Sequence, residues 1–326
     1  MTRGKSRGPS ERFGIGELFG RLVDCVSEEE RNSLIQHSVS SALSEYPECP
    51  FRIPSMAGSR RCSKKGGVCS MRKYKNADGI AERLPAPAGS LTVMCPFRFH
   101  ESLEVFSWVG EKVLGQQDPA KIVIPREVGF LQSINAGNAE ISGAENQDSD
   151  DVGKIDMILV DKDSIGSSHL QWCAMEIQAV YFSGEAMGSE FQAIKNHVGP
   201  GIPFPNKNRR PDYRSSGPKR LMPQLQTKIP SLRRWGKKMG VVVDRPFYEW
   251  LAAMEAVNDI SNSDIIWFVM DYEENLETAT ARLIRNKTHF TTLERAIDGL
   301  TGGLPVSLSE FETRILAKIA LESQRG

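Results

Sequence analysis

Two short apolar stretches, residues 154–160 (KIDMILV) and 172–180 (WCAMEIQAV), each carry one carboxylate where a hydrophobic residue would be expected. Stretches of this length and composition predict buried strands. Acidic side chains are almost never buried without a partner, because an unpaired buried carboxylate is costly. Asp156 and Glu176 therefore need a hydrogen bond, a basic side chain or a cation, and this requirement constrains the fold more than any other feature.

The two predicted strands are joined by a turn at residues 161–168, which would set Asp156 and Glu176 side by side. Gln178 follows Glu176 by two residues and points to the same face, because strand side chains repeat with period two. Mg²⁺ typically takes one or two carboxylates and completes its coordination with water and phosphate oxygens. The sequence thus predicts a magnesium site here. The alternative is that the two carboxylates pair with Lys or Arg.

An Asp on one strand followed by Glu-x-Lys on the next resembles the core of the PD-(D/E)XK nucleases. A glutamine at the lysine position is similar to the NotI-type restriction endonuclease family, as are the phrases 176–179 (EIQA) and 181–184 (YFSG). The resemblance implies an α/β fold, with a PD-(D/E)XK nuclease-like mixed sheet flanked by helices. It also implies a type II restriction endonuclease that hydrolyses double-stranded DNA sequence-specifically with Mg²⁺.

The resemblance assigns a role to each polar residue of this patch. Asp156 and Glu176 would hold Mg²⁺, which activates a water molecule and stabilises the developing negative charge. Gln178 occupies the usual lysine position, and because its amide is uncharged we assign it to water orientation. A third carboxylate should complete the site. Glu127, within a predicted strand, is preferred because a metal ligand needs a rigid element, and Glu140 is the alternative.

Four of the six cysteines lie in a segment rich in Gly, Lys and Arg that has little predicted core. Because the chain has no export signal, metal ligation or free thiols come before disulfides. Four thiolates suit Zn²⁺ or Fe, and the spacing does not choose between them. The resemblance implies a cysteine-bound structural iron, and unligated thiols remain the alternative. The four are Cys49, Cys62, Cys69 and Cys95.

The formal net charge is zero, but its distribution is uneven. Residues 206–238 contain eleven Lys or Arg and a single acid, Asp212. Phosphate groups attract such a segment, so we predict a DNA-binding loop over 199–238. The residues expected to contact DNA are Arg209, Arg210, Lys219 and Arg220.

Three regions are predicted along the chain: a disordered tail at 1–12, an N-terminal helix with the four-cysteine metal-binding segment at 13–100, and a nuclease catalytic domain at 101–326. Ser27 and Glu30 form a capping box that opens a helix extending to about Tyr46. Further helices are expected at 101–115, 189–198, 219–239, 247–257 and 307–322, and further strands at 122–131, 264–271 and 282–285.

The chain has no apolar stretch of membrane-spanning length and no signal-peptide core. We therefore expect a cytoplasmic prokaryotic protein without membrane contact. One active site cuts one strand, so a palindromic site predicts a homodimer. Two alternatives remain: a non-specific or repair nuclease of the same fold, and a non-catalytic metal-containing DNA-binding protein.

Overall fold

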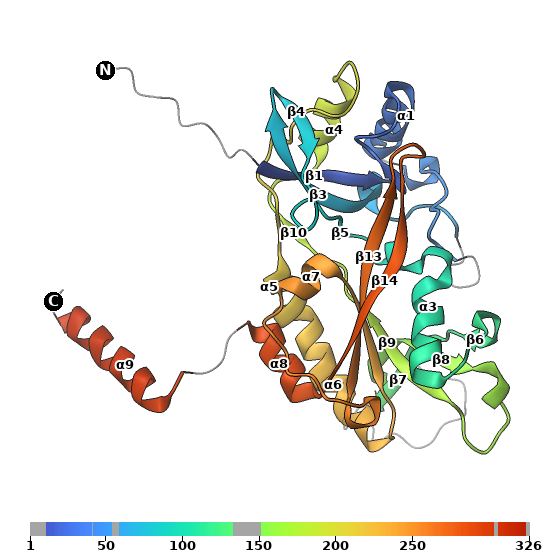
Figure 1. Ribbon diagram of the computed structural model, residues 1–326, viewed down its shortest axis with the longest axis vertical. Helices are drawn as coiled ribbons and strands as arrows, with labels where there is room; N and C mark the ends of the chain where they lie inside the picture. Colours follow the sequence, from blue (N-terminus) through green and yellow to red (C-terminus); the bar gives the residue numbers. More distant parts are fainter. Residues whose placement is uncertain (1–10, 41, 54–58, 133–150, 303–305, 324–326) are drawn as a thin grey trace.

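The computed structural model describes residues 11–40, 42–53, 59–132, 151–302 and 306–323. Within these ranges the chain forms two main sheets, one toward each end of an elongated molecule (Figure 1). Helices pack against both sheets. The predicted α/β class with a mixed sheet is confirmed.

The larger sheet has seven strands. They are β6 (Ile122–Val123), β7 (Arg126–Gln132), β8 (Asp151–Asp161), β9 (Trp172–Ile177), β12 (Met239–Asp244), β13 (Ile265–Asn275) and β14 (Thr280–Thr291). Their order is β14-β13-β12-β9-β8-β6, with β7 also paired to β8. β12 runs parallel to β9 and β13, whereas β8–β9 and β13–β14 are antiparallel. The predicted strands around Asp156 and Glu176 are therefore neighbours near the centre of this sheet.

The main helices are α1 (Glu28–Val39), α3 (Glu104–Val109), α4 (Gly188–Lys195), α5 (Tyr213–Ser216), α6 (Met222–Arg234), α7 (Arg245–Trp250), α8 (Leu293–Thr301) and α9 (Leu308–Ser323). Leu225 and Ile229 of α6 pack with Val241 on one face of the seven-stranded sheet. On the other face Trp108 of α3 meets the ring of Phe268 edge to face, with centroids 5.1 Å apart. The sheet thus has a helix layer on each face.

Short helical turns extend several of these helices. A 3-10 segment, η3 (Pro96–Leu103), precedes α3, and the π-helical turn η4 (Gly110–Leu114) follows it. Another π-helical turn, η9 (Gly217–Leu221), joins α5 to α6. Residues 213–234 of the predicted basic loop are therefore helical. The remaining short turns are η1 (Leu43–Glu45), η2 (Lys65–Gly67), η5 (Pro119–Lys121), η8 (Lys162–Ser164) and η10 (Ile260–Asn262).

The N-terminal part contains a sheet of its own, made of β1 (Glu11–Leu18), β2 (Arg21–Leu22), β3 (Val68–Ala77), β4 (Ile80–Arg83) and β5 (Thr92–Val93). The expectation that this segment has little core was wrong, because Ile15, Met71 and Tyr74 are fully buried. Phe191 and Ile202, which follow β9 in sequence, join the same core. The N-terminal unit is therefore completed by later chain, including the small sheet of β10 (Phe182–Ser183) and β11 (Arg210–Pro211).

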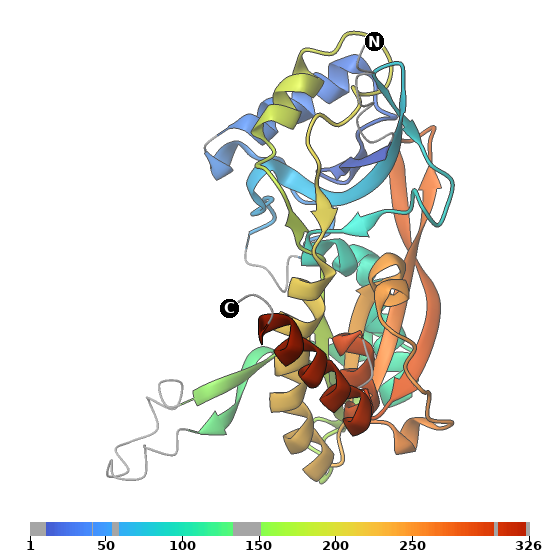
Figure 2. The ribbon, with the colours of Figure 1, turned by 90° about the vertical axis from the view of Figure 1, so that its left-hand side faces the viewer.

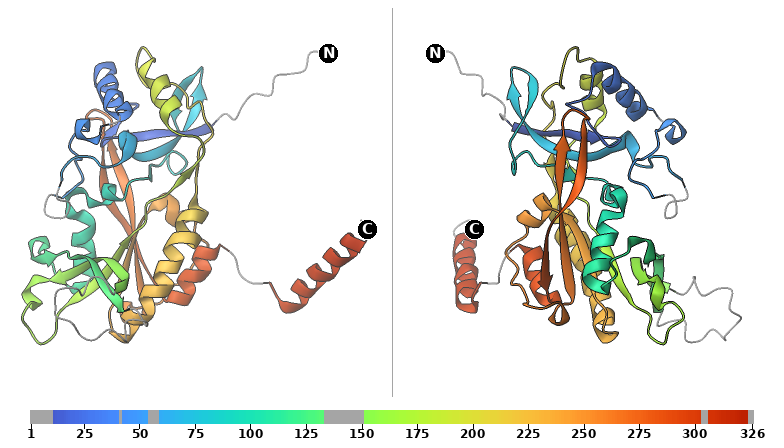
Figure 3. Two further views of the ribbon diagram at one scale, coloured as in Figure 1. Left: turned by 180° about the vertical axis from the view of Figure 1, so that it is seen from behind. Right: turned by 45° about the vertical axis from the view of Figure 1, so that its right-hand side comes forward.

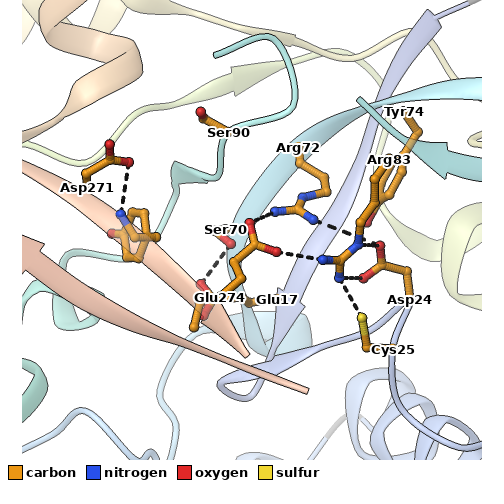
Figure 4. Close-up of polar contacts among 12 residues, drawn as sticks. Glu17, Asp24, Cys25, Ser70, Arg72, Tyr74, Arg83, Ser90, Asp271 and Glu274 are labelled. Atoms are coloured by element: carbon orange, nitrogen blue, oxygen red, sulfur yellow. Dashed lines mark hydrogen bonds and ion pairs between the residues drawn. The ribbon is translucent and has the colours of Figure 1, made fainter. Parts of the chain in front are cut away.

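The long β13–β14 hairpin belongs to the seven-stranded sheet and reaches the N-terminal sheet with its tip (Figures 1 and 3). At this junction Glu274 accepts hydrogen bonds from the guanidinium groups of Arg72 and Arg83 (Figure 4). Arg98 forms a fully buried ion pair with Glu17 at 3.0 Å and donates to the carbonyl of Ala281 on β14 at 2.7 Å. Removing one partner of a buried pair typically costs about 3–5 kcal/mol, so these contacts fix the two sheets to each other.

Several predicted boundaries shift in the structure. The Ser27 hydroxyl caps α1 as expected, accepting from the amide of Glu30, but the helix ends at Val39 rather than near Tyr46. The predicted helix 247–257 shortens to α7. The predicted disordered tail lies outside the described residues except for its last two, which begin β1. None of the helices in the described ranges is long and apolar enough to cross a membrane.

Candidate functional site

Asp156 and Glu176 both point toward helix α6. Side chains alternate between the faces of a strand, so Asp156 shares its face with Ile158, and Glu176 shares its face with Ala174. Ile158 and Ala174 belong to the core under α6. Two carboxylates from adjacent strands are thereby aimed at one side of the helix.

Lys228 of α6 lies between the two carboxylates. Its ammonium Nζ is 2.8 Å from Oε2 of Glu176, 3.3 Å from Oδ2 of Asp156 and 2.8 Å from Oε1 of Gln224. Lys228 and Glu176 are each only 5% exposed, whereas Asp156 is half-exposed. The alternative that the two carboxylates pair with Lys or Arg is therefore observed, and the lysine comes from the segment 199–238 that is predicted to bind DNA.

A signal for Lys228 was present in the sequence. The buried stripe of α6 includes Leu225, Ile229 and Leu232, and Lys228 follows Leu225 by three residues and precedes Leu232 by four. Residues at these spacings lie on the same helix face. A basic residue inside an apolar helix stripe indicates a buried cation. In the same way, Asp156 inside an apolar strand indicates a buried carboxylate.

The surroundings of Glu176 disfavour the charged form of its carboxyl group. Burial raises the pKa of the Glu176 carboxyl to about 8, the ammonium of Lys228 opposes this shift, and the neighbouring Asp156 carboxylate adds to it. Two carboxylates this close repel each other unless a cation lies between them. The ammonium of Lys228 supplies the positive charge between them.

A small cavity of about 180 Å³ opens beside Glu176 and Gln178. Basic groups lie around it: Lys64 comes from the segment between two of the cysteines, and Arg220 comes from η9. The guanidinium of Arg220 stacks 3.8 Å from the ring centroid of Tyr181 and donates to its hydroxyl. The side chain of Tyr181 is 44% exposed. Carboxylates beside basic groups suit a phosphodiester and its metal ion.

The remaining predicted site residues are Gln178, Glu127 and Glu140. Gln178 is buried, and its side-chain amide donates to the carbonyl of Ala179. Glu127 is exposed, and its backbone has a left-handed φ of 54°. Its two neighbours on β7 pair with the residues that precede and follow Asp156 on β8. Glu140 lies outside the described residues. Within the described part of the chain, no three His, Cys, Asp or Glu side chains form an arrangement that could hold a metal ion.

The four predicted cysteine ligands converge on one region. The backbone carbonyl of Cys69 on β3 accepts hydrogen bonds from the amides of Met94 and Cys95. The backbone amide of Cys62 donates to the carbonyl of Pro47, which lies two residues before Cys49. Burial raises the pKa of the Cys62 thiol to about 11, with the nearby Cys49 and Cys95 thiols contributing. Burial raises the pKa of Cys69 and Cys95 as well. The side chains are near one another but do not form a metal-binding arrangement within the described residues.

The predicted DNA-contacting residues divide into two groups. Arg210, Lys219 and Arg220 are exposed. Arg209 is buried, pairs with Glu190 at 2.6 Å, and donates to the carbonyls of residues 185 and 186. The guanidinium of Arg209 is thus engaged within the fold instead of being presented to DNA.

The structure therefore brings together two carboxylates from adjacent strands, a buried lysine and a cavity with basic groups. The family model described as Restriction endonuclease NotI matches residues 33–283, which is more than half of the chain. The chain therefore belongs to the NotI restriction endonuclease family. It is a type II site-specific deoxyribonuclease, a hydrolase that acts on double-stranded DNA. No curated protein matches it.

Proposed function

We propose that this enzyme cuts DNA through a site of the PD-(D/E)XK type formed by Asp156 and Glu176. The observation that carries the proposal is the convergence of these two carboxylates from β8 and β9 around one cation, beside a cavity with basic groups. The topology supports the proposal. β8 and β9 form an antiparallel pair, and the long segment that follows β9 ends in helix α6, directly before the parallel strand β12.

Restriction endonucleases generally use Mg²⁺, and the donor set suits it. Asp156 and Glu176 supply hard oxygen ligands, and the Lys228 ammonium between them supports a site for positive charge. Bound Mg²⁺ would lower the pKa of a water and stabilise charge on the scissile phosphate. Arg220 and Lys64 would hold the phosphate at the cavity, and Gln178 would orient the water. Glu127 remains the preferred third carboxylate.

The function is tested by digestion of a phage DNA of known sequence with the purified protein and Mg²⁺. We expect discrete fragments whose ends share one sequence, and no cleavage in EDTA. A smear would identify a nuclease without sequence preference, and intact DNA with stable binding would support the non-catalytic alternative. Sequencing the fragment ends would give the recognition site.

DNA would reach this site along the exposed basic groups that lead to it. Arg220 contributes to the cavity, and Arg210 and Lys219 are exposed on neighbouring segments. Lys and Arg at such positions neutralise phosphates without reading sequence. We therefore assign these three residues, without Arg209, to backbone contact.

We also propose that Cys49, Cys62, Cys69 and Cys95 hold one structural Fe or Zn²⁺. The support is their convergence and the chemistry of the donors: buried thiols stay protonated unless a cation compensates the charge of the thiolates. Cys49 is the least buried of the four. The metal would fix the loop that carries Lys64 beside the catalytic cavity.

A homodimer is the remaining proposal, and helix α9 offers a surface for it. α9 stands apart from the rest of the chain (Figures 1 and 3). It exposes an apolar stripe made by Leu308, Phe311, Ile315 and Ile319. Stripes of this kind pair with another helix.

The charges of α9 favour a second copy of the same helix as its partner. Along the helix the acidic residues Glu310 and Glu312 come first, the basic residues Arg314 and Lys318 follow, and Glu322 lies near the end. An antiparallel pair centred on Ile315 would place Glu312 near Lys318 of the partner subunit, as the two-fold symmetry of a dimer requires.

We expect the double variant Phe311→Glu/Ile315→Glu to be monomeric, because four carboxylates would meet at the centre of the helix pair. The matched control Thr313→Glu places the charge on the opposite side of α9 and should remain dimeric. Sedimentation equilibrium would measure the mass of each. A wild-type protein that is monomeric both free and on DNA, or a dimeric double variant, would contradict this arrangement.

A further inference from the structure

The active site contains a positive charge at an unexpected position in the chain. Two residues after Glu176 the strand carries Gln178, which cannot be charged, and its amide is directed to the carbonyl of Ala179. The only ammonium in hydrogen-bonding distance of either carboxylate, among the residues that the structure describes, belongs to Lys228. It comes from the helix that packs on the sheet and not from the strand.

We propose that Lys228 is a positioning residue that takes the place of the missing strand lysine. This inference rests on the proposed cleavage site at Asp156 and Glu176. The ammonium holds the two carboxylates in one arrangement across β8 and β9, with Glu176 at the edge of the cavity.

The surroundings of Lys228 set its position. Its stem lies along the buried side of α6 between Leu225 and Leu232, and its three N–H groups have three acceptors, on Asp156, Glu176 and Gln224. A buried ammonium is stable only when it is paired and fully hydrogen-bonded. Helix α6 therefore holds the ammonium with little freedom, as a catalytic constellation requires.

A placeholder role is the competing explanation. In that case the ammonium occupies the position of a divalent cation and leaves when the cation binds. The two explanations predict opposite results for removal of the charge: cleavage is lost if Lys228 positions the carboxylates, and metal binding improves without loss of cleavage if it only competes with the metal.

The test compares Lys228→Met, Gln178→Lys and the double variant with the wild type. Methionine keeps the length and apolar packing of the stem without the charge. We expect Lys228→Met to lower the single-turnover cleavage rate by about 10²-fold or more, with DNA affinity in Ca²⁺ changed less than about threefold. The double variant Gln178→Lys/Lys228→Met should regain at least about tenfold in rate, because it returns the charge to the strand.

Lys162→Met, which removes an exposed lysine in the turn after β8, serves as the matched control and should cleave normally. Calorimetric titration of Ca²⁺ into the DNA-free proteins gives a readout that is independent of cleavage. Normal cleavage by Lys228→Met with tighter Ca²⁺ binding would overturn the proposal, as would a double variant no faster than Lys228→Met. In either case cleavage by the wild type would leave the nuclease function standing.

Discussion

Asp156→Asn and Glu176→Gln are each expected to reduce DNA cleavage by roughly 10³-fold or more while leaving DNA binding intact. Each change removes the charge of a proposed Mg²⁺ ligand and keeps its shape. The Gln side chain at position 176 can still accept a hydrogen bond from Lys228, so the packing under α6 should persist. Cleavage is measured in Mg²⁺ under single-turnover conditions, and binding is measured in Ca²⁺.

Asp163→Asn is the matched control for this pair of variants. Asp163 lies in the turn between β8 and β9, is exposed and pairs with Lys121. Its replacement changes the net charge by the same amount but leaves the carboxylate pair untouched, so cleavage should match the wild type. Normal cleavage by either Asp156→Asn or Glu176→Gln would contradict the proposal that these two residues form the catalytic site.

Cys69→Ser is expected to release the metal that we propose for the four cysteines. The purified wild type should carry about one equivalent, coloured if Fe and colourless if Zn²⁺, and the variant should carry none. Cys69 belongs to β3, at the centre of the N-terminal sheet. Loss of a structural metal removes folding energy, so amide hydrogen exchange should increase around residues 59–95.

Cys25→Ser is the control for this change, because Cys25 accepts a hydrogen bond from Arg83 and lies outside the four-cysteine region. Serine can accept the same hydrogen bond, and the metal content should stay at one equivalent. Metal-free wild-type protein that still cleaves DNA would identify the four cysteines as ordinary thiols, as the alternative from the sequence holds.

The sequence predicted that Asp156 and Glu176 lie side by side, but it did not predict the lysine that lies between them. Asp156 and Glu176 were recognisable because each interrupts an apolar strand, and a short connection places the two strands side by side. Lys228 lies 72 residues after Asp156. Lys228 reaches the carboxylates only because α6 packs on the sheet. It was not recognised as part of the buried stripe of α6 because it lies within a run of basic residues.

The N-terminal sheet was missed for a different reason. β1 contains Gly14 and Gly16, and glycine weakens a strand pattern. The structure shows why these positions hold glycine: a Cβ at Gly14 would lie 2.6 Å from Pro205, and one at Gly16 would lie 2.7 Å from Leu91. Residues distant in sequence approach these two positions so closely that only glycine fits. Such long-range contacts cannot be inferred from the neighbouring residues in the sequence. Arg209 was misassigned similarly, because its partner Glu190 comes from another element.

The β13–β14 hairpin limits how far this enzyme can be treated as modular. A chimera that took residues 11–100 from a relative would separate Arg98 from Ala281, and Arg72 from Glu274. It would also lose the packing of residues 182–211 on the N-terminal core. An exchange of the N-terminal unit would therefore have to transfer three separate pieces of chain together. These are residues 11–100, the segment after β9 and the tip of the hairpin (Figure 2).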